Sequence, residues 1–454
     1  MKLESPRRWL VPVFFIACIV LGGSAQGIWL NMALQLAALG LLAWALLSRR
    51  SDELTSASRQ LLILLALTAV VIALQLIPLP TEVWTALPGR EPVATGYRAL
   101  GYSLPNLPLS LTPYETVSTI LVLLPALAVL VGILRIRQRE SWLAAALLLA
   151  TVAAVLLGAL QVAGGGPTRS PWYLYPLSNN RAVGFFANSN HMGSMLLVSI
   201  PFAMAVFASF ASRAGKRSPR GGLIAIGGAA LAVIATGVAL NRSLAAAGLA
   251  IPVLLFSTLL LPATLNIRRL ALVTGTLALV GSVIVLSGSP IAADAAAGNI
   301  ASIESRAGIW ESTVELIRQT FPFGSGLGSF DSVYPLTEAP AQVRQTYVNH
   351  AHNDYLQIVL ELGIAGIFLL LLFLIWWVVQ VVAVWRSPLS THYARAATIA
   401  TAAVLAHSIV DYPLRTAAMS AIFAMCLGLM SQPRRERQSG DDPQARPTKH
   451  VTLG

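Results

Sequence analysis

Charged residues are scarce in this sequence of 454 residues, in which Asp, Glu, Lys and Arg together make up only 11%. Soluble domains carry about 25% charged residues. Hydrophobic residues instead reach 56%, and the mean hydropathy is +0.70. Apolar stretches of about 20 residues, the length that crosses a bilayer, recur along the whole chain. The composition therefore predicts a polytopic membrane protein and excludes a soluble enzyme, a fibre or a disordered chain.

Cysteine is also rare, with two residues in the whole chain. Cys18 and Cys426 both fall within apolar stretches, where a cysteine acts as a small buried apolar side chain. This placement excludes a disulfide framework and argues against redox chemistry.

The apolar stretches predict an all-α integral-membrane domain over residues 1–432 with twelve membrane spans. An uncleaved first span is favoured over a cleaved signal peptide, and the even number of spans depends on it. The remaining residues, 433–454, are polar and are predicted to form a disordered cytoplasmic tail. The predicted spans cover residues 9–28, 30–48, 60–79, 115–134, 141–163, 190–210, 222–240, 243–262, 270–289, 353–384, 396–412 and 414–432.

The distribution of charge along the chain predicts the orientation of these spans. With the N-terminus in the cytoplasm, the cytoplasmic segments contain 22 of the 31 basic residues but only 7 of the 19 acidic ones. This asymmetry follows the positive-inside rule and places both termini in the cytoplasm. It also accounts for the net charge of +12 without a nucleic-acid partner.

The longest predicted outer segment covers residues 290–352. Apolar residues recur in it at helical spacing, while most of its Glu and Arg residues fall on other faces. This pattern predicts an amphipathic helix that lies on the outer surface of the bilayer. The apolar positions are Ile303, Ala307, Trp310, Val314, Ile317 and Phe321.

Candidate substrate-binding side chains gather near the predicted outer ends of different spans, where a charge is costly unless it faces protein, water or a ligand. Several Arg guanidiniums offer a set of donors that suits a diphosphate, and helix N-termini near Asn residues add backbone N–H groups. A diphosphate in the outer leaflet indicates a lipid-linked sugar. The candidates are Arg181, Asn188, Asn190, Arg242, Arg306 and Asn353.

His350 and His352 are the candidate catalytic residues, because histidine can take a proton from an acceptor hydroxyl near neutral pH. The activated hydroxyl would attack the anomeric carbon while the arginines stabilise the departing lipid diphosphate. The spacing offers no third ligand for a metal, and no cofactor is predicted. The sequence leaves open which histidine is the base.

Each candidate also has a purely structural interpretation. The Asn residues can cap helices, and the Arg residues can snorkel to the interface or pair on the surface. Asp411 and Arg415, around the last outer turn, are interpreted as an ion pair across a helix junction. The alternative function, a flippase or exporter of lipid-linked glycans, predicts ionisable residues near the bilayer midplane, whereas the predicted span centres are almost uncharged.

Three segments, taken in order, resemble the O-antigen ligase and polymerase superfamily over roughly residues 180 to 375. Each segment alone is a weak signal, and their order on one predicted face makes the combination fairly specific. The segments are Arg181-x-x-Gly184-Phe185-x-x-Asn188-x-Asn190, then Arg306-x-x-x-Trp310 leading to Pro322-x-Gly324-x-Gly326, then His350-x-His352-Asn353-x-Tyr355-Leu356 with Glu361-x-Gly363.

The resemblance implies a glycosyltransferase of the C-type membrane fold in the bacterial inner membrane, which uses undecaprenyl-diphosphate glycans on the periplasmic side. It implies that His352 is the family histidine, that Arg242 and Arg306 bind the diphosphate, and that Arg181 is a further candidate. Ligases transfer the glycan to lipid A core, polymerases to a growing polysaccharide, and a third group to protein hydroxyls. Nothing in the predicted outer loops distinguishes these acceptors.

Overall fold

The computed structural model describes residues 9–24, 28–48, 53–136, 138–175, 180–213, 220–261, 290–338, 340, 343 and 348–432. Side chains are described in these ranges except at residues 213, 220–224 and 290–304. The predicted ninth span, 270–289, and the predicted tail, 433–454, lie outside the described residues.

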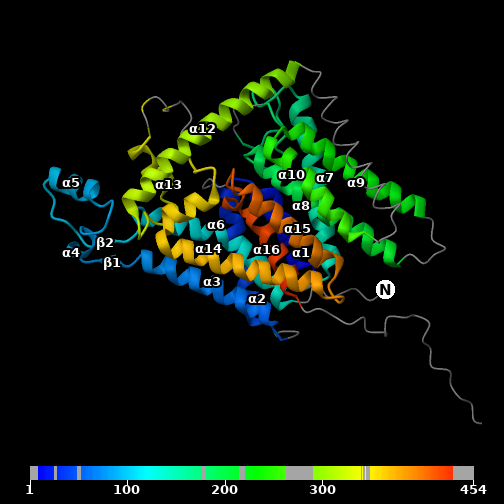
Figure 1. Ribbon diagram of the computed structural model, residues 1–454, viewed down its shortest axis with the longest axis horizontal. Coiled ribbons are helices and arrows are strands. Elements are labelled where there is room, and N and C mark those ends of the chain that lie inside the picture. Colours follow the sequence, from blue (N-terminus) through cyan, green and yellow to red (C-terminus); the bar gives the residue numbers. More distant parts are fainter. Residues whose placement is uncertain are drawn as a thin grey trace, which may run out of the picture.

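Every predicted span within the described residues contains a helix, which confirms an all-α membrane protein (Figure 1). Among the described residues, six helices are long and apolar enough to cross a bilayer, namely α2, α3, α6, α7, α8 and α14, and α1, α9, α10 and α16 are shorter apolar helices. The count of twelve spans stays a prediction. The helices are α1 (Leu10–Leu21), α2 (Trp29–Leu47), α3 (Ser56–Gln75), α6 (Pro113–Arg135), α7 (Glu140–Ala163), α8 (Ser189–Arg213), α9 (Arg220–Asn241), α10 (Leu244–Ser257), α14 (Asp354–Arg386), α15 (His392–His407) and α16 (Ala417–Ser431).

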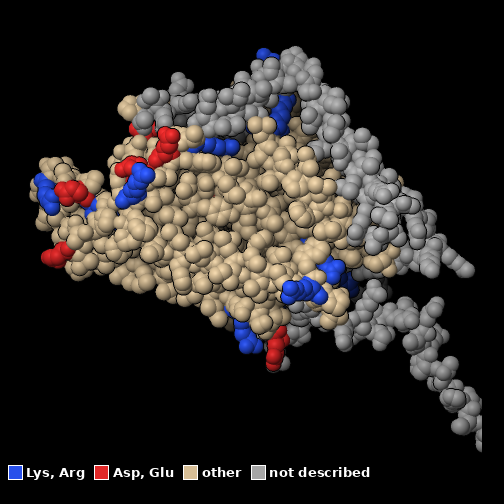
Figure 2. All heavy atoms as spheres, in the orientation of Figure 1, with Lys and Arg blue, Asp and Glu red and all other residues tan. Residues whose placement is uncertain are grey.

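Helix α16 lies at the centre of the bundle, where it packs against α6, α15, α1 and α14 (Figure 1). All 15 of its residues are buried, which explains why its sequence is apolar or small on every side. The outer helices α3 and α14 expose much of their apolar surface instead. Figure 2 shows the charged side chains near the edges of the visible face, with a broad uncharged area over α3 and α14 between them. This distribution fits a bundle surrounded by lipid.

Helix α14 is interrupted at Gly363, which has a left-handed backbone with φ of 58°. The interruption leaves backbone N–H and C=O groups of α14 without partners in the helix, and the loop at residues 321–329 forms hydrogen bonds with them. Ile364 N donates to Pro322 O at 2.9 Å, and Ser325 N donates to Leu360 O at 2.9 Å. The loop therefore fixes the first part of α14, whose N-terminus begins next to His352.

Replacing Gly363 by alanine should destabilise the protein strongly, because the added Cβ would lie 2.0 Å from Pro322 O at a left-handed φ. Strain and overlap together should lower the free energy of unfolding by roughly 2–5 kcal/mol. The matched control is Gly40→Ala in α2, where a Cβ meets no atom within 4 Å and alanine favours the helix. Denaturant unfolding in mixed micelles measures the free energy of unfolding of both variants. Equal unfolding midpoints for the two variants would contradict the role of the interruption.

A small hairpin projects from the bundle at the end where α12 lies (Figure 1). Its strands β1 (Pro78–Leu79) and β2 (Leu107–Pro108) pair antiparallel, with Pro78 opposite Pro108, and enclose α4 (Thr81–Trp84) and α5 (Glu91–Ala99). The buried Arg90 connects the hairpin to the 321–329 loop by donating to Gly324 O at 3.3 Å.

The predicted amphipathic helix is present as α12 (Pro290–Thr320). Its buried face differs from the predicted apolar positions, because Ala307 is exposed whereas Thr313 is fully buried. Ile309 and Leu316 pack against Phe330 and other residues of α13 (Phe330–Val333), η3 (Tyr334–Leu336) and α14. One face of α12 therefore covers protein, and its contact with the bilayer surface stays a prediction.

Candidate active site

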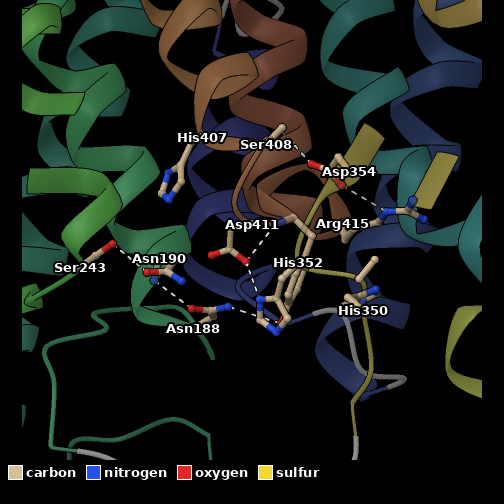
Figure 3. A network of polar contacts seen from close by, with 12 residues as sticks. Asn188, Asn190, Ser243, His350, His352, Asp354, His407, Ser408, Asp411 and Arg415 are labelled. Carbon is tan, nitrogen blue, oxygen red and sulfur yellow. Dashed lines mark hydrogen bonds and ion pairs between the residues drawn. The ribbon is translucent and has the colours of Figure 1, made fainter. Parts of the chain in front are cut away.

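Four of the predicted site residues, Asn188, Asn190, His350 and His352, lie close together where the N-termini of α8 and α14, the turn between α9 and α10, and the turn between α15 and α16 meet (Figure 3). Each segment lies at one end of an apolar helix, so its polar residues lie at one end of the bundle. Trp310 of α12 also reaches this place, because its indole N–H donates to Ala351 O at 2.9 Å. Topology therefore brings residues far apart in sequence to one site.

His352 faces Asp411 across the site, with 3.2 Å between Nδ1 and Oδ1. The Asp411 side chain is 1% exposed and the His352 side chain 24% exposed. An ionised carboxylate only accepts hydrogen bonds, so this contact assigns the imidazole proton to Nδ1 and leaves Nε2 as an acceptor. A carboxylate in this position can hold an imidazole in one tautomer and orientation, as general-base chemistry requires.

The backbone of His352 adopts a left-handed conformation, with φ of 49°. A non-glycine residue rarely has a positive φ, and such positions concentrate at functional sites. The next residue, Asn353, caps α14, since its Oδ1 accepts from Tyr355 N at 3.0 Å and Leu356 N at 3.1 Å. The cap begins the helix directly after His352 and so fixes where the imidazole lies.

The sequence-based pairing of Asp411 with Arg415 is wrong. Arg415 Nη1 instead donates to Glu361 Oε2 at 2.9 Å, and its Nε donates to Asp354 Oδ1 at 3.4 Å. Both acids belong to α14, which lies within the predicted span 353–384. Asp411 is thus left for His352, a role that sequence reasoning missed because an aspartate in a short turn carries no signal of its partner.

His350 lies beside His352 and packs at 4.2 Å between ring centroids against Tyr412, which His352 also contacts at 4.8 Å. Its Nδ1 lies 3.2 Å from Gln357 Nε2. Burial lowers the pKa of His350 well below its ordinary value, and the nearby Arg415 and His352 lower it further. His350 is therefore neutral at physiological pH.

Asn188 and Asn190 connect the start of α8 to neighbouring segments. Asn188 Oδ1 accepts from Asn190 N at 2.8 Å, and its Nδ2 donates to the Tyr412 hydroxyl at 3.4 Å. Asn190 Oδ1 accepts from Ser243 Oγ at 2.7 Å, which holds the turn between α9 and α10. The two amides therefore position the segment that carries Arg242 relative to Tyr412.

Arg181, Arg242 and Arg306 lie close together. Arg181 Nη1 donates to Arg242 O at 3.5 Å, and Arg242 Nη1 donates to Asn180 O at 3.3 Å. Burial lowers the pKa of Arg181, and the like charges of Arg242 and Arg306 lower it further. Arg306 also lies near Tyr412, where burial raises the pKa of the Tyr412 hydroxyl and the positive charge of Arg306 acts to lower it. Three guanidiniums in one half-buried place favour an anion there.

Within the part of the chain that the structure describes, no three or more His, Cys, Asp or Glu side chains are placed to hold a metal ion. His350 and His352 face different partners, Gln357 and Asp411, rather than a common point. Metal independence stays a prediction.

Residues 218–371 match the family model described as O-antigen ligase. The match covers Arg242, Arg306, His350 and His352, whereas Arg181 and Asp411 lie outside it. Among curated proteins, none matches the chain. The apolar helices make this a multi-pass membrane protein, and the match over residues 218–371 supports its resemblance to the O-antigen ligase and polymerase superfamily.

Proposed function

We propose that the protein transfers a glycan from undecaprenyl diphosphate to an acceptor hydroxyl on the periplasmic face of the bacterial inner membrane. The observation that carries this proposal is the pair of His352 and Asp411 beside three clustered arginines. A base and an anion site are the two parts that glycosyl transfer from a lipid diphosphate requires. The family match supports a ligase or a polymerase.

In the proposed reaction, His352 Nε2 takes the proton from the acceptor hydroxyl as its oxygen bonds to the anomeric carbon. The bond from that carbon to the diphosphate oxygen breaks, and the electron pair leaves with undecaprenyl diphosphate. Asp411 stabilises the imidazolium that forms, and Arg181, Arg242 and Arg306 stabilise the charge on the leaving diphosphate. A single direct displacement inverts the anomeric configuration.

Asn188, Asn190 and Asn353 are assigned a supporting role on the substrate side. Their amide oxygens accept hydrogen bonds from protein groups, which fixes the N-termini of α8 and α14 beside the arginines and histidines. Helix N-termini favour anions. The asparagines therefore place two N-termini where they assist diphosphate binding.

The transfer itself is tested with protein in proteoliposomes, an undecaprenyl-diphosphate tetrasaccharide as donor, and three acceptors. The acceptors are lipid A core oligosaccharide, a second undecaprenyl-diphosphate tetrasaccharide, and a peptide with Ser and Thr. Mass spectrometry of the product identifies a ligase, a polymerase or a protein glycosyltransferase, respectively. Movement of the donor across the bilayer without any product would contradict transfer and favour a flippase.

The arginine cluster is tested with Arg306→Gln, which removes a charged donor from α12. Binding of undecaprenyl diphosphate in nanodiscs should weaken by about 10–100-fold, the effect of losing one hydrogen bond to a charged group. The matched control is Arg318→Gln on the same helix, where the side chain is 73% exposed and pairs with Glu315. The control should change binding less than about twofold. Equal losses in both variants would indicate a nonspecific charge effect.

A further inference from the structure

The orientation of the Gln357 amide is fixed by three partners. Its Oε1 accepts from Ala351 N at 3.1 Å, and its Nε2 donates to Glu361 Oε1 at 2.8 Å. A backbone N–H can only donate and a carboxylate can only accept, so the oxygen and nitrogen of this amide cannot be exchanged. The second N–H of Nε2 therefore points to His350 Nδ1, 3.2 Å away.

This contact determines the tautomer of His350. Because Gln357 donates, His350 Nδ1 must accept, and the single proton of the neutral imidazole is on Nε2. A protonated imidazole has no acceptor atom for the Gln357 N–H, and the groups that face His350 include the cation Arg415 and the imidazoles of His352 and His191. His350 is thus the opposite tautomer of His352, which holds its proton on Nδ1 toward Asp411.

We infer that His350 is a fixed hydrogen-bond donor for the acceptor, and that the acceptor is a sugar that presents a second hydroxyl beside the attacking one. The inference rests on the proposed function and assigns the roles of the two histidines within it. His352 Nε2 takes the proton of the attacking hydroxyl, and His350 Nε2–H donates to the neighbouring hydroxyl oxygen.

The placement of the two histidines supports this division. In Figure 3, Ser243, which follows Arg242, lies on one side of His352, and His350 lies on the other side. His350 therefore lies away from the segment that carries Arg242 in this view. His350 and His352 both pack against the ring of Tyr412, so their separation is fixed. A sugar ring offers neighbouring hydroxyls to two such groups, whereas a Ser or Thr side chain offers one.

The tautomer is tested by ¹⁵N NMR of histidine-labelled protein in bilayers, with His350→Asn used to assign the signal. Between about pH 5.5 and 8.5, His350 should keep an unprotonated Nδ1 and a protonated Nε2. In Gln357→Leu, which removes the amide donor, both tautomers should appear. A His350 that titrates in this range, holds its proton on Nδ1, or is unchanged in Gln357→Leu would overturn the assignment.

The acceptor role is tested by kinetics with lipid A core oligosaccharide and with the undecaprenyl-diphosphate tetrasaccharide as acceptors. In His350→Leu, the KM for the sugar acceptor should rise by about tenfold, the effect of one neutral hydrogen bond, while binding of undecaprenyl diphosphate stays unchanged. His350→Gln retains an N–H donor and should restore most of the loss. Equal acceptor KM values in wild type and His350→Leu, or equal losses in both variants, would overturn the role.

The Ser and Thr peptide separates the two acceptor classes, because it should receive no glycan. Transfer to the peptide at the rate of a sugar acceptor would overturn the inference while leaving glycosyl transfer intact. Absence of transfer to every acceptor would overturn the proposed function and with it the acceptor role, whereas the NMR spectra decide the tautomer separately.

Discussion

His352→Asn should lower the rate of glycan transfer by about 10²–10⁴-fold, the contribution of a positioned general base. Asparagine is the suitable replacement because it tolerates the left-handed φ of 49° at this position, whereas alanine would add backbone strain. Binding of undecaprenyl diphosphate should stay within about twofold of wild type, since the arginines are untouched. The measurement is the initial rate of product formation under saturating donor.

The control for this variant is His392→Asn, which makes the same substitution at the other end of α15 from the turn that carries Asp411. It should leave the transfer rate unchanged, because His392 lies outside the site. A His352→Asn protein that transfers glycan at the wild-type rate would exclude His352 as the base.

Arg415→Met should destabilise the protein by about 3–5 kcal/mol, because it leaves two buried carboxylates without their cation. Asp354 and Glu361 are 6% and 0% exposed, and both contact the Arg415 guanidinium, at 3.4 and 2.9 Å. Gln357 also contacts Glu361 and His350. The first part of α14 and the His350 side chain should therefore both become more mobile. Denaturant unfolding in mixed micelles gives the change in the free energy of unfolding.

A combined variant distinguishes lost charge balance from lost packing. Adding Asp354→Asn and Glu361→Gln to Arg415→Met removes the uncompensated charges and should restore part of the stability. Arg318→Met, which breaks the exposed pair with Glu315, should cost less than about 1 kcal/mol. If Arg415→Met lowers the free energy of unfolding no more than Arg318→Met does, the buried ion pairs do not stabilise the fold.

Hydropathy located the helices because a span must be apolar along its whole length. The predicted span 141–163 matches α7 (Glu140–Ala163) closely. The prediction 396–412 differs from α15 (His392–His407) because Thr391 caps the helix by accepting from Ala394 N, while the apolar residues after His407 form a turn. Helix ends depend on such local hydrogen bonds, which mean hydropathy does not detect.

The site could be predicted only in part. The positive-inside rule and the placement of polar residues at predicted span ends indicated Arg181, Arg242, Arg306, His350 and His352. Pairing is a tertiary property, so the contact between His352 and Asp411, 59 residues apart, had no local signal. The interruption of α14 at Gly363 was likewise hidden, because its freed backbone groups are satisfied by a loop from a distant segment.

We propose that this membrane protein breaks the bond between a glycan and undecaprenyl diphosphate by direct attack of an acceptor hydroxyl. The most direct measurement is the release of undecaprenyl diphosphate by purified protein in nanodiscs, with the anomeric configuration of the product determined by NMR. We predict one undecaprenyl diphosphate released per glycan transferred, with inversion at the anomeric carbon. Retention of configuration, or no release of undecaprenyl diphosphate with any acceptor, would contradict it.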